Sequence, residues 1–164
     1  ALPSLAVRDQ IARECVNIAY GFFSPLEGFM GQADVDAVAR HMKITPRSAQ
    51  FRPAVYYASA IELFEFQDAV KAEHGSAQGY SAVTNMFLPK QNAVYMADEA
   101  RSYRGGRTLD DSVAHEFVHY FQYHYKGEKE NPRPDQDALE VEAVRVQEWL
   151  RNVAMAAGKS PCSP

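Results

Sequence analysis

Residues 108–125 read TLDDSVAHEFVHYFQYHY, and this stretch does most to decide the fold. Thr108 and Asp111 have the spacing of a capping box at a helix start, and Gly127 follows as a typical helix stop. Between them, apolar side chains recur every three or four positions, as on a helix with one buried face. The sequence therefore predicts a helix from Thr108 to about Tyr125, whose apolar face holds Ala114, Phe117, Val118, Phe121 and Tyr125.

The same helix contains the motif H-E-x-x-H as His115, Glu116 and His119. Residues four apart on a helix differ by only about 40° in direction, so the two imidazoles can bind one metal ion. Glu116 follows directly after His115 and can act as a base beside the metal without ligating it. Asp111, one turn earlier, is a candidate to orient one imidazole, although a role at the helix start explains it equally well.

A catalytic zinc site needs a third protein ligand, and the last predicted helix offers two. Asp135 is a candidate cap for this helix, which we expect to reach about Ala157. Glu140 and Glu142 are two residues apart and flank its apolar stripe on opposite sides, so one of them at most can face the metal. Helix geometry alone does not choose between them.

The rest of the chain predicts an α+β fold, predominantly helical, with a small sheet or hairpin packed on the H-E-x-x-H helix. No internal repeat divides it, so 164 residues are expected to form one domain. The expected parts are N-terminal helices and a first strand (1–79), a hairpin with the two site helices (80–157) and a tail (158–164). The expected elements before the site are helices at 4–22, 34–42 and 59–73, a strand at 55–57 and hairpin strands at 80–88 and 93–97.

Composition excludes some classes of partner. The net charge is −4, no basic run exists, and no apolar stretch is long enough to cross a bilayer, so we expect neither nucleic-acid binding nor membrane insertion. The two cysteines, Cys15 and Cys162, could form one disulfide closing nearly the whole chain. That pairing and a start without Met fit a secreted or periplasmic protein whose signal has been removed.

With a glutamate on a following helix, the motif resembles the gluzincin family of zinc metallopeptidases, thermolysin and its relatives. The family often has a small residue three places after its ligand glutamate, and Glu140 followed by Ala143 matches that register. The resemblance thus implies Zn²⁺ held by His115, His119 and Glu140, with Glu142 as the fallback. The resemblance is closest to the compact minigluzincins, and it implies a single zincin-like domain over residues 1–164. Gln147, Trp149 and Leu150 fit the tail helix of those proteins.

The resemblance also extends to the predicted hairpin, where the family's edge strand pairs with the substrate backbone. Carried over, Asn85 and Met86 would bind an extended peptide by strand addition. A donor for the oxyanion is also needed, and Tyr123 is the first candidate with Tyr103 as another.

The expected function is a zinc metallopeptidase with a peptide or protein substrate, in which Glu116 is the general base toward a zinc-activated water. Two alternatives stay open: an inactive, peptidase-derived module that binds a peptide or protein partner, and a zinc hydrolase of non-peptide amides. The chain is too short for the second lobe of thermolysin, so a narrow substrate range is expected.

Overall fold

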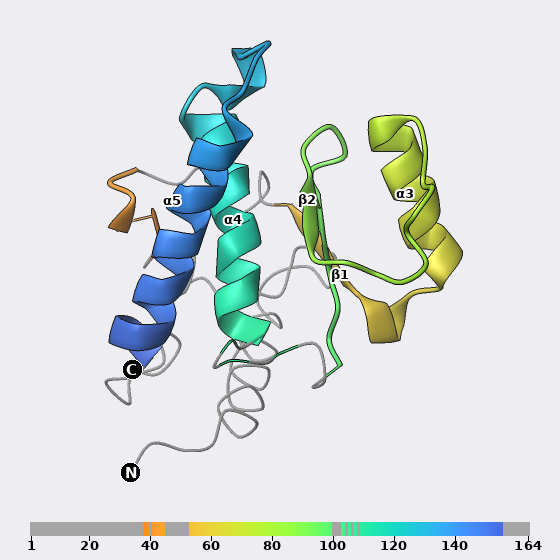
Figure 1. Ribbon diagram of the computed structural model, residues 1–164, viewed down its shortest axis with the longest axis horizontal. Coiled ribbons are helices and arrows are strands. Elements are labelled where there is room, and N and C mark those ends of the chain that lie inside the picture. The colour runs from red at the N-terminus through yellow and green to blue at the C-terminus, as the bar shows by residue number, and fades with distance from the viewer. Residues whose placement is uncertain are drawn as a thin grey trace.

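The computed structural model describes residues 38–39, 41–44, 53–99, 103, 105, 107 and 109–155. In this part of the chain the fold is mixed α and β, as the sequence predicted, and Figure 1 shows the helices beside a small sheet. Three α-helices and three strands make up its main elements: β1 (Ala54–Tyr57), α3 (Leu63–His74), β2 (Met86–Leu88), β3 (Ala93–Met96), α4 (Leu109–Tyr125) and α5 (Gln136–Trp149).

The sheet has the order β1-β3-β2. The hairpin strands β2 and β3 are antiparallel, with Phe87 opposite Val94, whereas β1 adds to the other edge in parallel, with Val55 opposite Val94. All four residues of β3 are buried, because this central strand is covered on both faces.

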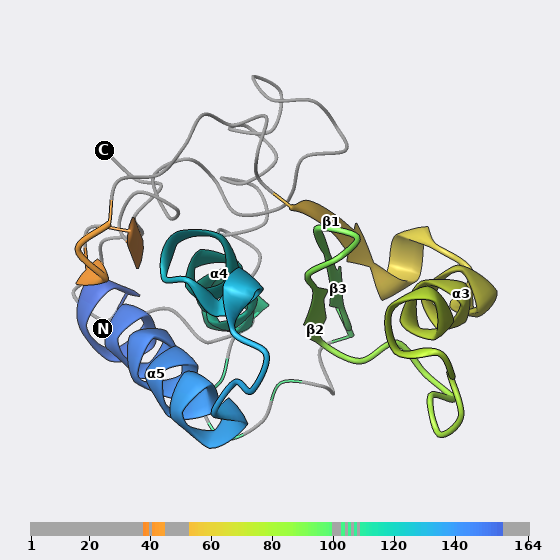
Figure 2. The same ribbon diagram turned by 90° about the horizontal axis from the view of Figure 1, so that it is seen from above.

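Helices cover the two faces of the sheet, and the view in Figure 2 shows the sheet between α4 and α3, with α5 outside α4. Side chains alternate across a strand, so Val94 and Met96 pack with α4 and α5, while Ala93 and Tyr95 pack with α3. Each face therefore has its own apolar cluster, and α4 is held between the sheet and α5.

Helix α3 begins later than predicted. The sequence predicted a capping box of Ser59 and Glu62, but the box consists of Glu62 and Glu65, and α3 begins at Leu63. Ser59 instead donates its hydroxyl and its backbone N–H to Asp98 in the segment after β3. A tertiary contact thus takes the side chain that the local pattern had assigned to the helix start.

The hairpin strands are shorter than predicted, since β2 begins at Met86 rather than near Tyr80. Asn85 explains this boundary, because its side-chain oxygen accepts the N–H of Ala97 at 2.7 Å, in place of a backbone partner. The turn between the strands is fixed from α3, where the buried Glu73 carboxylate accepts the N–H groups of Lys90 and Gln91.

The two site helices agree closely with the sequence prediction. Helix α4 begins one residue after Thr108 and ends at Tyr125. Helix α5 is capped by Asp135, whose carboxylate accepts the N–H of Ala138, and it continues as the π-helical segment η5 (Leu150–Met155). The chain between them makes the short 3₁₀ turn η4 (Glu128–Glu130).

Some of the sequence predictions fall outside the described residues, namely the helix at 4–22, most of the helix at 34–42, and both Cys15 and Cys162. Of the helix at 34–42, residues 38, 39 and 41 are described and are helical. Among the helices that the structure does describe, none is long and apolar enough to cross a membrane.

Candidate metal centre

The two histidines of the motif face each other from α4. Their Nε2 atoms lie 3.3 Å apart, and the ring centroids of His115 and His119 are separated by 5.0 Å. Both rings lie against α5, since their Nε2 atoms contact the carboxylate of Glu140. One turn of helix thus brings two nitrogen ligands to one point.

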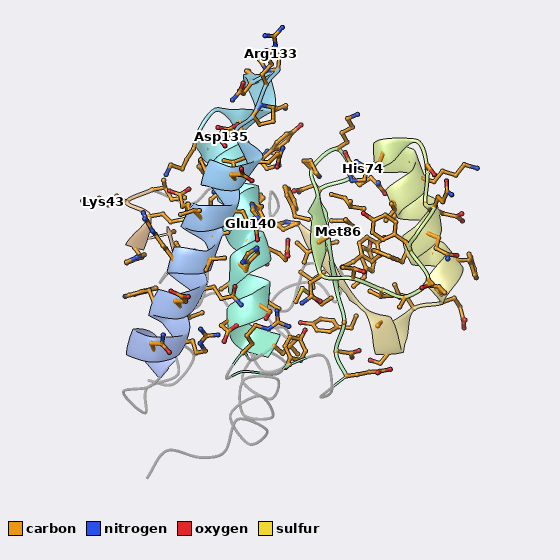
Figure 3. All side chains as sticks on the ribbon, in the orientation of Figure 1. Lys43, His74, Met86, Arg133, Asp135 and Glu140 are labelled. Atoms are coloured by element: carbon orange, nitrogen blue, oxygen red, sulfur yellow. The ribbon has the colours of Figure 1, made fainter. Side chains whose placement is uncertain are left out.

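Helix α5 supplies a carboxylate at the same point. Glu140 lies 2.8 Å from His115 Nε2 through one oxygen and 3.1 Å from His119 Nε2 through the other. Figure 3 labels Glu140 where α5 lies against α4. Glu142 is bound elsewhere, since its oxygens accept from Gln122 and Lys126. Among the residues that can be described, the atoms of His115, His119 and Glu140 form a group with metal-ligand geometry, all within 4.8 Å of one another.

These distances fit a transition-metal ion. Zinc binds imidazole nitrogen at about 2.0–2.1 Å in tetrahedral geometry, which requires ligand atoms about 3.3 Å apart. The Nε2 atoms of His115 and His119 already have that separation. Two imidazoles and a carboxylate are also the donor set that zinc uses where one position is left for another ligand.

Each histidine is held from behind by a glutamine. The Nδ1 atom of His115 lies 2.8 Å from the side-chain oxygen of Gln147, and that of His119 lies 2.9 Å from the side-chain oxygen of Gln122. Sequence reasoning did not assign either glutamine a role in orienting a ligand. Their spacing was a usable signal, because Gln122 is three residues after His119 and Gln147 is two turns after Glu140.

Asp111, predicted as a candidate to orient one imidazole, contacts the glutamine that holds His115. Its fully buried carboxylate accepts a hydrogen bond of 2.8 Å from the side-chain amide of Gln147. It is therefore linked to His115 through that glutamine.

Glu116 is buried against the same cluster, with 6% of its surface exposed. Burial, together with the nearby charge of Glu140, raises its pKa to about 8, while a hydrogen bond from the backbone of Phe87 on β2 opposes the shift. Burial also lowers the pKa of His115, with a contribution from His119, while Glu140 and Gln147 act in the opposite direction. A neutral imidazole is the form that binds metal.

A cavity of about 930 Å³ opens beside the cluster, and it is lined by the three candidate ligands, Glu116 and residues of β2 and η4. Asn85, Met86 and Tyr123 also line it, so the structure brings these predicted residues to the same space. Figure 3 labels Met86 beside β2. The side chain of Tyr123 packs edge-on against Phe87, with ring centroids 6.3 Å apart.

Two of the predicted residues have structural partners. Asn85 holds the backbone of Ala97, as described above, and its amide lies 3.5 Å from the hydroxyl of Tyr103. Tyr103 donates that hydroxyl to the carbonyl of Ala97. The roles of Asn85, Met86, Tyr123 and Tyr103 toward a substrate remain predictions.

Comparison with known proteins places the chain in a different family from the one that the motif suggested. Residues 1–87 match the PUA-like domain. The chain is also 40% identical over 57 residues to sulfate adenylyltransferase of Cenarchaeum symbiosum, and 32% identical over 89 residues to sulfate adenylyltransferase of Chloroflexus aurantiacus. These matches cover 35% and 54% of this chain but only 15% and 23% of the two relatives. No solved structure gives a significant match.

These findings correct the prediction of a gluzincin or minigluzincin, because the relatives are named as transferases and not as hydrolases. The predicted metallopeptidase activity and the alternative of a peptidase-derived, peptide-binding module are wrong for the same reason. The matched region ends inside β2, whereas His115, His119 and Glu140 lie beyond it. The match covers just over half of the sequence, and the chain belongs to the PUA-like domain family.

Proposed function

We propose that this protein binds a divalent transition-metal ion, with Zn²⁺ as the first candidate, through His115 Nε2, His119 Nε2 and the carboxylate of Glu140. The observation that carries the proposal is the convergence of these three ligand atoms within 4.8 Å. Mixed nitrogen and oxygen donors favour zinc-like ions over Mg²⁺ or Ca²⁺, which prefer oxygen ligands alone.

The surroundings support a centre that also takes an external ligand. The Glu140 side chain is 56% exposed, and the cavity beside it reaches Glu116. A zinc ion bound here would supply Lewis acidity toward an oxygen atom of that ligand. The buried Glu116 carboxyl lines the same cavity beside the candidate ligands, so it is placed to accept a proton from such a ligand.

The arrangement of elements supports a second part of the proposal, that the hairpin, α4 and α5 form a zincin-like core. The support is that α4 packs against both the sheet and α5 and that one ligand comes from α5. This concerns the geometry around the metal and implies no peptidase activity.

Metal binding can be tested by titrating the chelator-treated protein with Zn²⁺ in a calorimeter and by measuring bound zinc with elemental analysis. One ion per chain is the expected result for the wild type. His115→Ala, His119→Ala and Glu140→Ala should each weaken binding at least about 100-fold, because each removes a direct ligand. Glu148→Ala is a matched control, because this exposed glutamate of α5 is not among the residues that line the cavity. Wild-type binding no tighter than that of the three ligand variants would refute the proposal.

The likeness to sulfate adenylyltransferases supports a second candidate function, a part in adenylyl transfer to sulfate. The observation that favours it is the 40% identity over 57 residues, although the chain spans under a quarter of the relatives' length. Incubating the chain with ³⁵S-sulfate and an adenylyl nucleotide donor tests it directly. Labelled adenylyl sulfate above the level of a protein-free control would support this function, and its absence would exclude the activity for this chain alone.

A further inference from the structure

The two glutamines behind the histidines bind them through atoms of known polarity. An amide oxygen only accepts hydrogen bonds, so an imidazole nitrogen that bonds to it must carry the proton. The side-chain oxygens of Gln147 and Gln122 lie 2.8 Å and 2.9 Å from the Nδ1 atoms of His115 and His119. If each glutamine keeps this orientation, both neutral imidazoles have the proton on Nδ1 and a lone pair on Nε2.

The orientation of Gln147 is fixed by its other neighbour. Its amide nitrogen donates to a carboxylate oxygen of Asp111 at 2.8 Å. A carboxylate only accepts hydrogen bonds, and Asp111 is completely buried. Arg151 lies 3.8 Å from the second oxygen of Asp111. A flipped Gln147 would bring its oxygen against the carboxylate, so the amide oxygen must face His115.

The orientation of Gln122 is fixed in the same way by two acceptors. Its amide nitrogen donates to the carbonyl oxygen of Leu139 at 3.0 Å and to a carboxylate oxygen of Glu142 at 2.9 Å. A carbonyl oxygen only accepts hydrogen bonds, so the nitrogen and not the oxygen of the Gln122 amide must face Leu139. The second oxygen of Glu142 accepts from Lys126 at 2.8 Å, which holds the Glu142 carboxyl beside that nitrogen. The amide oxygen of Gln122 is therefore directed at His119.

We propose that Gln122 and Gln147 are positioning residues that set the Nδ1–H tautomer of both histidines, so that two Nε2 lone pairs and the Glu140 carboxylate point at one centre. The two Nε2 atoms are 3.3 Å apart, and the carboxylate oxygens approach them to 2.8 Å and 3.1 Å. Three electron-pair donors this close to one another can bind a single metal cation. The consequence for metal affinity rests on the metal binding proposed above. The tautomers can be read without metal once the Glu140 carboxylate, which competes for a proton on both Nε2 atoms, is removed.

The tautomers can be measured by long-range ¹H–¹⁵N NMR of the imidazole rings in chelator-treated protein at pH 8.5. Glu140→Ala is the suitable background, because the Glu140 carboxylate would otherwise compete for a proton on Nε2. We expect His115 and His119 to show the chemical shifts of protonated Nδ1. Adding Gln147→Met, an isosteric change without the amide, should move only His115 toward the Nε2–H form, and Gln122→Met should move only His119.

A rescue variant separates the hydrogen bond from mere packing. Gln122→Glu combined with Glu142→Gln, which puts an amide donor opposite the new carboxylate, keeps an acceptor for His119 Nδ1–H. It should therefore retain the tautomer that Gln122→Met loses. With Glu140 intact, each methionine variant should weaken Zn²⁺ binding about 10- to 100-fold. Glu148→Ala, an exposed change on α5, should alter neither readout.

The outcomes distinguish this inference from the proposed function. Nε2–H tautomers in the Glu140→Ala protein, or tautomers that do not respond to the methionine variants, would overturn the inference even if the wild type binds zinc. Tautomers that behave as expected in a protein that binds no zinc would support it and refute the metal site. If Gln147→Met does not fold, the methionine and rescue variants at Gln122 still test the inference, because Gln122 contacts the other histidine.

Discussion

Two buried glutamates on opposite sides of the sheet differ in the partners of their carboxylates. Glu73 of α3 and Glu116 of α4 are 7% and 6% exposed. Glu73 accepts backbone N–H groups of Lys90 and Gln91 and fixes the hairpin turn. Glu116 lies near a second carboxylate, Glu140, and its raised pKa reflects burial with little compensation.

The difference separates a structural region from a candidate functional one. On the α3 side, the Glu73 carboxylate is satisfied by backbone N–H groups of the protein itself, as is usual for buried groups. On the α4–α5 side, nitrogen and oxygen lone pairs converge on one point. Carboxyl groups with a perturbed pKa beside a cavity are typical of functional sites. Variants on the two sides of the sheet should therefore differ in their effects on stability and on metal binding.

The largest expected effect is the pH dependence of stability on the Glu116 side. The pKa of Glu116 is about 8 in the folded protein, above its ordinary value of 4.5. The folded state therefore keeps a proton that the unfolded chain loses as pH rises between these values, so folding is destabilised over that range. Glu116→Gln should remove this penalty and gain up to about 5 kcal/mol over the wild type at pH 9. Urea unfolding of chelator-treated protein at pH 4.5 and pH 9 measures the gain, and a gain equal at both would contradict the account.

Zinc should stabilise the folded protein through the same cluster. A ligand that binds only the folded state at 100 times its Kd adds about 2.7 kcal/mol to the free energy of unfolding. Thermal unfolding with and without Zn²⁺ should show this increase in the wild type and not in Glu140→Ala. An equal increase in both proteins would mean that the metal binds elsewhere.

On the α3 side, Glu73→Ala should cost about 2 kcal/mol of stability, because it leaves two backbone N–H groups of the turn without their partner. Its affinity for Zn²⁺ should stay within about twofold of wild type, since no ligand moves. Chemical unfolding and calorimetry test the two halves separately. A large loss of zinc binding in this variant would show that the two regions are not independent.

The smallest effect is expected at Lys126 and Glu142, whose ion pair of 2.8 Å is partly exposed. Lys126→Ala should cost under about 1 kcal/mol, because such pairs are screened by water. Lys126→Ala should also weaken zinc binding only a few-fold, because it frees the Glu142 carboxylate that accepts from Gln122, the residue that holds His119. Calorimetry and urea unfolding at low and high salt measure both, and a loss as large as that of Glu140→Ala would place Lys126 in the site itself.

The sequence predicted the parts of the fold that depend on local signals. The boundaries of α4 and the Asp135 cap of α5 follow from capping patterns and periodicity. The start of α3 was wrong because Ser59 bonds to Asp98, 39 residues away. The parallel pairing of β1 with β3 also depends on contacts between distant segments, which no local pattern encodes.

The candidate site shows the same limit. The spacing of His115 and His119 on one helix predicts that they face one point, because it is a local property. The structure places Glu140, and not Glu142, at that point, which helix geometry had left open. The glutamines depend on how α5 lies against α4. The resemblance to gluzincins was misleading: it rested on residues from about 80 to 150, whereas the family match covers residues 1–87 and is to the PUA-like domain.

The central claim is most directly tested by the stoichiometry of zinc in the purified protein. After saturation with Zn²⁺ and gel filtration, native mass spectrometry should find one ion per chain in the wild type and none in the double variant His115→Ala/His119→Ala. Equal zinc in both, or none in either, would contradict the account.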